Sequence, residues 1–96
     1  MLTRRQQELY NAFYESTHTN EYLDQKTEVL VGLAAAITMN CAPCVRYYLQ
    51  QAEKADINKG EISEVLAKVM AVAAGQKRLQ MEQVIDDFGI DIESFG

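Results

Sequence analysis

The sequence predicts an all-α protein that forms a single domain over residues 1–96. Apolar residues recur at intervals of three and four along most of the chain, which is the period of an α-helix. The 96 residues include one proline and five glycines, too few for an architecture rich in β-turns. A chain of this length builds one core of limited size. We therefore expect a bundle of about five short helices.

The first two expected helices are separated by a polar segment. The first ends near Ser16, and residues 17–20 interrupt the helical pattern. Its apolar positions are Leu2, Leu9 and Phe13. Asp24 is placed to cap a second helix over residues 25–39. The last two-thirds of this helix, VLVGLAAAITM, is apolar on nearly every side, so we expect it to be the most buried element.

The third expected helix begins at Cys41-Ala-Pro-Cys44, which holds the only two cysteines of the chain, and runs to about Ala55. We expect Asn40 to be its N-cap, with Pro43 tolerated in the first turn. At i and i+3 the two thiols share a face, with β-carbons about 5–6 Å apart, near the roughly 3.5–4.5 Å of a disulfide. The partial positive charge of a helix N-terminus also favours the thiolate. This placement predicts a redox-active dithiol.

The fourth and fifth expected helices follow a second capping signal. Asn58 and Glu61 form a capping-box variant with asparagine at the cap. One apolar stripe then runs through Ile62, Val65, Leu66, Val69, Met70 and Ala73. Gly75 is expected to kink or end this helix. A fifth helix over residues 76–88 should stop at Gly89.

Two other interpretations of the cysteine pair stay open. Structural zinc normally has four protein ligands, and His18 is the only other strong soft-metal ligand in the chain. A complete zinc site would therefore need a second copy of the chain. Alternatively, the cysteines are ordinary buried residues, because unpaired cysteine behaves as a small hydrophobe. For the single chain we expect no metal and no cofactor.

Composition and charge exclude several classes of partner. The formal net charge is −5, and the nine basic residues form no stripe, which disfavours nucleic-acid binding. The N-terminus has no apolar core of signal-peptide length. The longest apolar run, residues 29–39, is too short to span a bilayer, so we expect no membrane partner. We therefore expect a cytoplasmic protein, where a CxxC pair is more often redox-active or metal-binding than a permanent structural disulfide.

The segment from Lys26 to Cys44, KTEVLVGLAAAITMNCAPC, resembles the AhpD-like, or carboxymuconolactone decarboxylase, family. The likeness lies in a K-T-x-x-L-x-x-L-A opening, an alanine-rich helix, the CxxC and the aromatic pair Tyr47-Tyr48. It continues through the capped helix at Glu61 and covers about residues 20–88. The resemblance implies an AhpD-like helical domain that assembles into homotrimers or homohexamers. For members with CxxC, it implies thiol–disulfide or peroxide-reducing activity.

This chain departs from the proton relay of the family's strong hydroperoxidases. Those members carry a glutamate before the CxxC, a histidine inside it and a histidine four residues after its second cysteine. An ungapped alignment places Val29, Pro43 and Tyr48 at these positions. Glu28 lies one residue away, which rotates its side chain by about 100° around the helix. Tyr48 shares a helix face with the second cysteine and is able to donate a hydrogen bond to a thiolate, so it is a candidate auxiliary residue. Glu28 is expected to point elsewhere, and it is a candidate auxiliary residue only as the one nearby carboxylate, should the alignment be shifted by one residue.

Together these features predict a dithiol oxidoreductase that reduces peroxides or disulfides. The expected catalytic residues are Cys41 and Cys44. One of them attacks the substrate, and the other resolves the product into a Cys41–Cys44 disulfide. An external dithiol then reduces this disulfide. Proximity to the helix end favours Cys41 as the attacking thiol, whereas the resemblance implies Cys44. Arg46 is expected to be an exposed or interface charge. His18 is expected to be an exposed loop residue, with a base delivered from this loop as the alternative.

The sequence also leaves two alternative functions open. Decarboxylation of a lactone acid, which the family's other name suggests, would need cationic or polar groups around an anionic substrate. No cluster of histidine and arginine stands out in the sequence. The other alternative is a non-enzymatic oligomeric scaffold whose cysteines bind metal between subunits.

Overall fold

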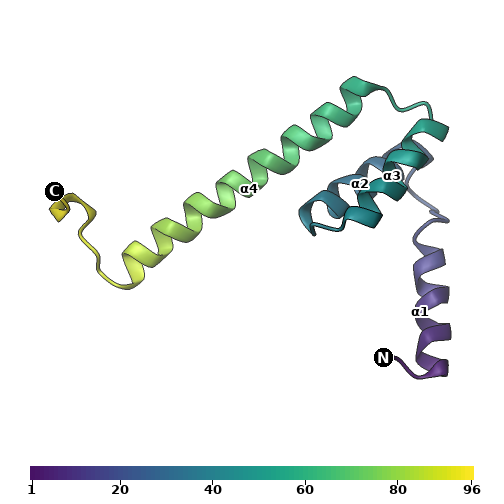
Figure 1. Cartoon of the computed structure of the whole chain (residues 1–96), viewed down its shortest axis with the longest axis horizontal. Coiled ribbons are helices and arrows are strands. Elements are labelled where there is room, and N and C mark those ends of the chain that lie inside the picture. Colours follow the sequence, from purple (N-terminus) through teal and green to yellow (C-terminus); the bar gives the residue numbers. More distant parts are fainter.

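The computed structural model describes residues 1–96, and its regular elements are all helices, without strands (Figure 1). Its elements are α1 (Arg4–Ser16), α2 (Gln25–Thr38), α3 (Ala42–Lys54), α4 (Lys59–Asp87) and a short 3-10 helix, η1 (Ile92–Ser94). Helices α2 and α3 pack against each other, whereas α1 and most of α4 extend away from this pair. The prediction of an all-α single domain is confirmed.

Polar side chains fix the first residues of α2 and α4. The backbone N–H of Thr27 donates to the Asp24 carboxylate at 2.7 Å, and this hydrogen bond lowers the pKa of that carboxyl below its usual value. The N–H of Glu61 donates to Asn58 Oδ1 at 2.9 Å. Both caps satisfy N–H groups that the helix itself leaves without a partner. The expected N-caps of α2 and α4, Asp24 and Asn58, are therefore confirmed.

The expected N-cap of α3, Asn40, is wrong. Asn40 has a φ of 56°, and its N–H donates to the Ile37 carbonyl while the N–H of Cys41 donates to the Ala36 carbonyl. These two bonds are the Schellman pattern that closes the C-terminus of α2, and asparagine tolerates the left-handed conformation that the pattern needs. The N-cap of α3 is therefore Cys41 itself. Asn40 thus closes the C-terminus of α2 rather than capping the N-terminus of α3.

The expected helix break at Gly75 is also wrong, so the chain has four α-helices rather than five. Helix α4 runs without interruption for 29 residues. Glycine costs about 1 kcal/mol relative to alanine inside a helix, but unlike proline it keeps its N–H donor. The strong helix formers on both sides of Gly75 outweigh this cost. Despite its length, α4 is too polar to cross a membrane, and no other helix is long enough to do so.

The core of the single chain is very small. Five residues are buried: Val29, Leu33, Ala36, Ala52 and Ile57. Three of them lie on α2, which confirms it as the most buried helix. An ion pair between Lys26 Nζ and Glu61 Oε1, at 3.1 Å, joins the first turn of α2 to the first turn of α4. Only this end of α4 is held against the α2–α3 pair.

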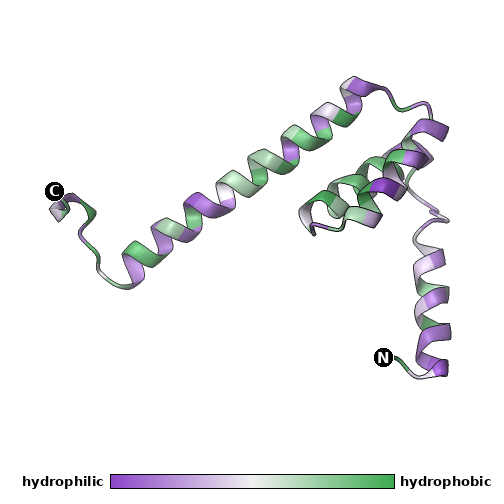
Figure 2. Cartoon of the chain, viewed as in Figure 1, coloured by the Kyte–Doolittle hydropathy of each residue, from purple (hydrophilic) through white to green (hydrophobic).

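Much apolar surface stays uncovered in the isolated chain. The radius of gyration is 19.1 Å, whereas a compact domain of this length has about 13 Å. The accessible surface is 8182 Å², against roughly 5,500 Å² for a compact monomer of 10.8 kDa. Figure 2 shows apolar residues along the whole of α4. The most exposed large ones on α1 and α4 include Leu9, Phe13, Met70, Leu79 and Met81, and the exposed Phe88 directly follows α4.

Candidate functional site

The two cysteines lie where α2 ends and α3 begins. They are joined by a disulfide, with their Cα atoms 5.2 Å apart. Cys41 is the N-cap of α3 and Cys44 lies in its first turn, with Pro43 between them where no N–H is lost from the helix. Both cysteines are half-buried. The proximity predicted from the i, i+3 spacing is confirmed.

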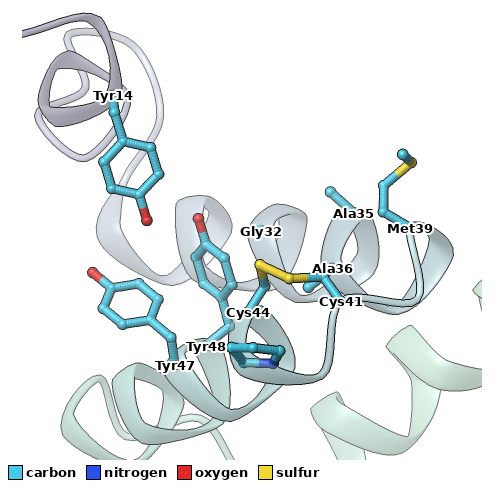
Figure 3. Close-up of a pocket in the computed structure, with 10 residues that line it drawn as sticks. Tyr14, Gly32, Ala35, Ala36, Met39, Cys41, Cys44, Tyr47 and Tyr48 are labelled. Atoms are coloured by element: carbon cyan, nitrogen blue, oxygen red, sulfur yellow. A yellow bond between two sulfur atoms is a disulfide. The ribbon is translucent and has the colours of Figure 1, made fainter. Parts of the chain in front are cut away.

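An apolar cavity of about 430 Å³ opens directly onto the disulfide. Ten residues from α1, α2, α3 and the α2–α3 link surround it, and none of them is charged. The polar groups at its edge are the hydroxyls of Tyr14, Tyr47 and Tyr48, which point toward a shared space in Figure 3. The cavity therefore suits a neutral, largely apolar molecule placed against the two sulfurs.

The disulfide is also accessible from its other side. A shallow groove of about 720 Å³ is lined by residues that include Asn40, Cys41 and Arg46. Arg46 is exposed there, as expected, and forms none of the ion pairs of the chain. Cys41 lines both the groove and the apolar cavity, whereas Cys44 lines the cavity alone. The two sulfurs thus differ in the molecules that are able to reach them.

Tyr48 is held between the core and the cavity. Its ring packs against the core cluster that contains Val29 and lies directly over Gly32 of α2, where a β-carbon would overlap the ring. Burial raises the pKa of the Tyr48 phenol, with the negative charge of Glu28 as the next cause. Burial likewise raises the pKa of Tyr47. Both phenols therefore stay protonated at neutral pH and are available as hydrogen-bond donors.

We expect Gly32→Ala to displace Tyr48 and to destabilise the protein by about 1–3 kcal/mol, the usual cost of overpacking a close contact. Gly75→Ala is the matched control, because nothing lies within 4 Å of a β-carbon at that position in α4. Alanine there should stabilise the helix by about 0.5–1 kcal/mol. Urea denaturation of both variants at equal concentration measures the two effects. Equal stability of Gly32→Ala and the parent would contradict the packing of Tyr48 on Gly32.

His18 and Glu28 meet behind the tyrosines. His18 Nδ1 lies 3.4 Å from Glu28 Oε1, with 22% and 16% of the two side chains exposed. The imidazole also packs edge-on against Tyr14, at 4.8 Å between ring centroids, and against Tyr47, at 5.6 Å. The expectation of an exposed loop histidine is therefore wrong, because the aromatic side chains of α1 and α3 cover it.

Glu28 does not reach the disulfide cavity, in agreement with its expected rotation. It lines two smaller cavities on the side of His18. Val29, the position that the resemblance aligns with the relay glutamate, is 2% exposed and belongs to the core cluster against which Tyr48 packs. The two aligned positions are thus neighbours, and both carry residues that cannot act as a base at neutral pH.

The sequence reasoning missed Tyr14 and Tyr47 as residues of the site and undervalued His18. One signal was present in the sequence, because Tyr10 and Tyr14 share a face of α1 and His18, two residues beyond the end of that helix, continues their spacing of four. That spacing indicates a shared face, but not which other helix the face would meet.

Comparisons with known proteins agree with this architecture. The sequence matches the model of the carboxymuconolactone decarboxylase family over residues 5–87. A crystal structure of a protein from Methanobacterium thermoautotrophicum, solved in a structural genomics programme, superimposes with a TM-score of 0.75. The two sequences are 23% identical, and the match covers 80% of this chain and 86% of that one, so the likeness concerns the fold. No curated protein sequence gives a significant match.

Proposed function

The chain belongs to the carboxymuconolactone decarboxylase family, and from this premise we propose that it is a dithiol oxidoreductase that reduces peroxides or disulfides with Cys41 and Cys44. The observation that carries the proposal is the position of the disulfide, which borders an apolar cavity on one side and an open groove on the other. A purely structural disulfide needs no access to small molecules. A disulfide that must be formed and reduced in each cycle needs both an oxidant and a reductant to reach it.

In the proposed cycle with a peroxide, the Cys44 thiolate attacks the terminal oxygen of the substrate. The O–O bond breaks, the alkoxide takes up a proton to give an alcohol, and Cys44 becomes a sulfenic acid. The Cys41 thiol then attacks the Cys44 sulfur and releases water as the disulfide forms. An external dithiol reduces the disulfide by attacking Cys41 from the open groove, and is itself oxidised. Such a cycle suits the cytoplasm, where thiol reductants are maintained.

The choice of Cys44 as the attacking thiol follows from access. Cys44 lines only the apolar cavity, next to the phenols, whereas Cys41 lines both openings. A larger dithiol in the groove reaches Cys41 and not Cys44, so Cys41 suits the reductive half of the cycle, and Cys44 is left as the sulfur that meets a peroxide in the cavity. Each half of the cycle then uses its own side of the disulfide.

The decarboxylase alternative is supported less well by the same cavity. A lactone acid is anionic, and binding it away from water would call for a cationic partner. No arginine, lysine or histidine lines the cavity beside the disulfide. An apolar organic hydroperoxide or a neutral disulfide matches the cavity better.

The proposal is tested by oxidising the fully reduced protein with one equivalent of cumene hydroperoxide, an apolar probe, or of hydrogen peroxide. We expect mass spectrometry to find a loss of two hydrogens and a peptide cross-linked between Cys41 and Cys44. Dithiothreitol should restore both thiols, and the apolar peroxide should react faster because the cavity is apolar. If both thiols stay open to alkylation after either peroxide and after an oxidised dithiol, the redox function is refuted. Zinc bound at about half an ion per chain would instead favour the scaffold function.

A further inference from the structure

The open groove beside Cys41 carries one positive charge and no negative charge. The side chain of Arg46 is exposed there, and none of the ion pairs of the chain includes it. The other polar side chains that line the groove, besides Cys41, are the amides of Asn40 and Gln50, which are able to donate hydrogen bonds. Glu53, the first acidic residue of α3, lies seven positions beyond Arg46, about 10 Å further along the helix. The groove is therefore suited to an anion.

One face of α3 forms the wall of the groove that carries this charge. The residues of the face are spaced by three and four and all line the groove: Ala42, Val45, Arg46 and Leu49. The first turn of α3 has no acidic residue, and its N-cap makes no side-chain hydrogen bond. The partial positive charge of the helix N-terminus is therefore not offset by a neighbouring carboxylate. This charge and the guanidinium both favour a negative group beside the Cys41 sulfur.

The cavity on the other side of the disulfide differs from the groove in charge. No charged residue lines that cavity, and moving a carboxylate into an apolar space without a partner is costly. An anionic molecule is therefore directed to the groove, and a neutral, apolar one to the cavity. Of the two sulfurs, the groove gives access to that of Cys41 and not to that of Cys44. The two openings thus separate two reactants by their charge.

We propose that the reductant of the disulfide is a thiol that carries a carboxylate, and that Arg46 binds this carboxylate while the thiol attacks Cys41. This inference rests on the proposed function. The thiolate of the reductant forms a bond to the Cys41 sulfur, the Cys41–Cys44 bond breaks, and Cys44 leaves as a thiolate that takes up a proton. A second thiol, of the same or another reductant molecule, then attacks the reductant sulfur of this mixed disulfide. Cys41 is released as a thiol and the reductant leaves as a disulfide, so that two electrons and two protons have passed to the cysteines.

The test compares 3-mercaptopropionate with its neutral amide, 3-mercaptopropanamide, as reductants of the oxidised protein. Each thiol is supplied in large excess, and mass spectrometry of acid-quenched samples counts both the mixed disulfide and the dithiol as reacted. We expect the ratio of the two rate constants, anionic over neutral, to fall about threefold to fivefold in Arg46→Gln, the scale of one exposed ion pair. Differences in the intrinsic reactivity of the two thiols cancel when this ratio is compared between variants. Salt at about 1 M should lower the ratio of the parent in the same way, because it screens charges beyond about 3 Å.

Three further variants separate a local charge from the charge of the whole chain. Arg46→Lys keeps the positive charge and should keep most of the ratio, whereas Arg46→Glu should lower it below that of Arg46→Gln. Lys54→Gln removes the same charge from an exposed position in the last turn of α3 and should keep the ratio of the parent. Equal ratios in the parent, Arg46→Gln and Arg46→Glu, or an equal fall in Lys54→Gln, would overturn the inference and leave the dithiol function standing. A disulfide that neither thiol reduces would instead refute the proposed function, and this inference with it.

Discussion

Replacing Cys44 with serine is expected to reduce dithiol-supported peroxide turnover by about a thousandfold or more, the scale of loss when a reacting nucleophile is removed. A hydroxyl at this position cannot supply the thiolate that attacks the peroxide. Cys41→Ser should also abolish turnover, but at a later step. In that variant Cys44 still reacts once, and the sulfenic acid has no second thiol with which to form a disulfide.

The two variants are separated by trapping the product with dimedone, which labels sulfenic acids. After one equivalent of peroxide, Cys41→Ser should carry one dimedone adduct on Cys44, and Cys44→Ser should carry almost none. The double variant Cys41→Ser/Cys44→Ser is the control for unspecific oxidation and should carry no adduct. An adduct on Cys41 in Cys44→Ser would reverse the proposed order of attack. Turnover that survives in either single variant would refute the dithiol mechanism.

We propose that the chain assembles into a homotrimer or homohexamer. The isolated chain exposes about 2,700 Å² more surface than a compact monomer of its mass. A standard interface removes only about 800 Å² from each partner, so this excess is enough for more than one interface. Light scattering during size-exclusion chromatography should give three or six times the chain mass of 10.8 kDa. A mass of one chain would contradict the proposed assembly.

A charge introduced on the apolar face of α4 should disrupt that assembly. Positions 66, 70, 81 and 88 lie within a sector of about 60° around the helix. Met70→Glu places a carboxylate in this sector, and burying it without a partner would cost several kcal/mol per subunit. The expected result is a smaller mass than that of the parent.

A neighbouring residue supplies the matched control for Met70→Glu. Ala71 is exposed, and its side chain lies about 100° away, on the face that carries Glu64 and Arg78. Ala71→Glu adds the same charge to the same turn of the helix and should keep the mass of the parent oligomer. If Met70→Glu also kept that mass, this face of α4 would not be part of the interface.

Much of the candidate site follows from short spacings along the chain. The i, i+3 relation of Cys41 and Cys44 predicted their proximity, and the i+4 relation to Tyr48 predicted its place on the same face. Both relations are fixed by the geometry of one helix and need no knowledge of the rest of the fold. The N-cap of α3 was misjudged because asparagine suits a helix start and a left-handed helix end almost equally well. The hydrogen bonds around Asn40 and Cys41 distinguish the two.

The sequence by itself determined the helical class, the caps of α2 and α4, the burial of α2 and the proximity of the two cysteines, because local hydrogen bonds, apolar periodicity and the geometry of one helix fix them. Only the tertiary structure decided that α1 and the following turn bring Tyr14 and His18 to α3, and that Glu28 meets His18. Those contacts join separate helices, and their energy depends on how the elements pack rather than on any short segment. The tertiary structure also decided that α4 continues through Gly75, because a single glycine weakens a helix without fixing where it ends.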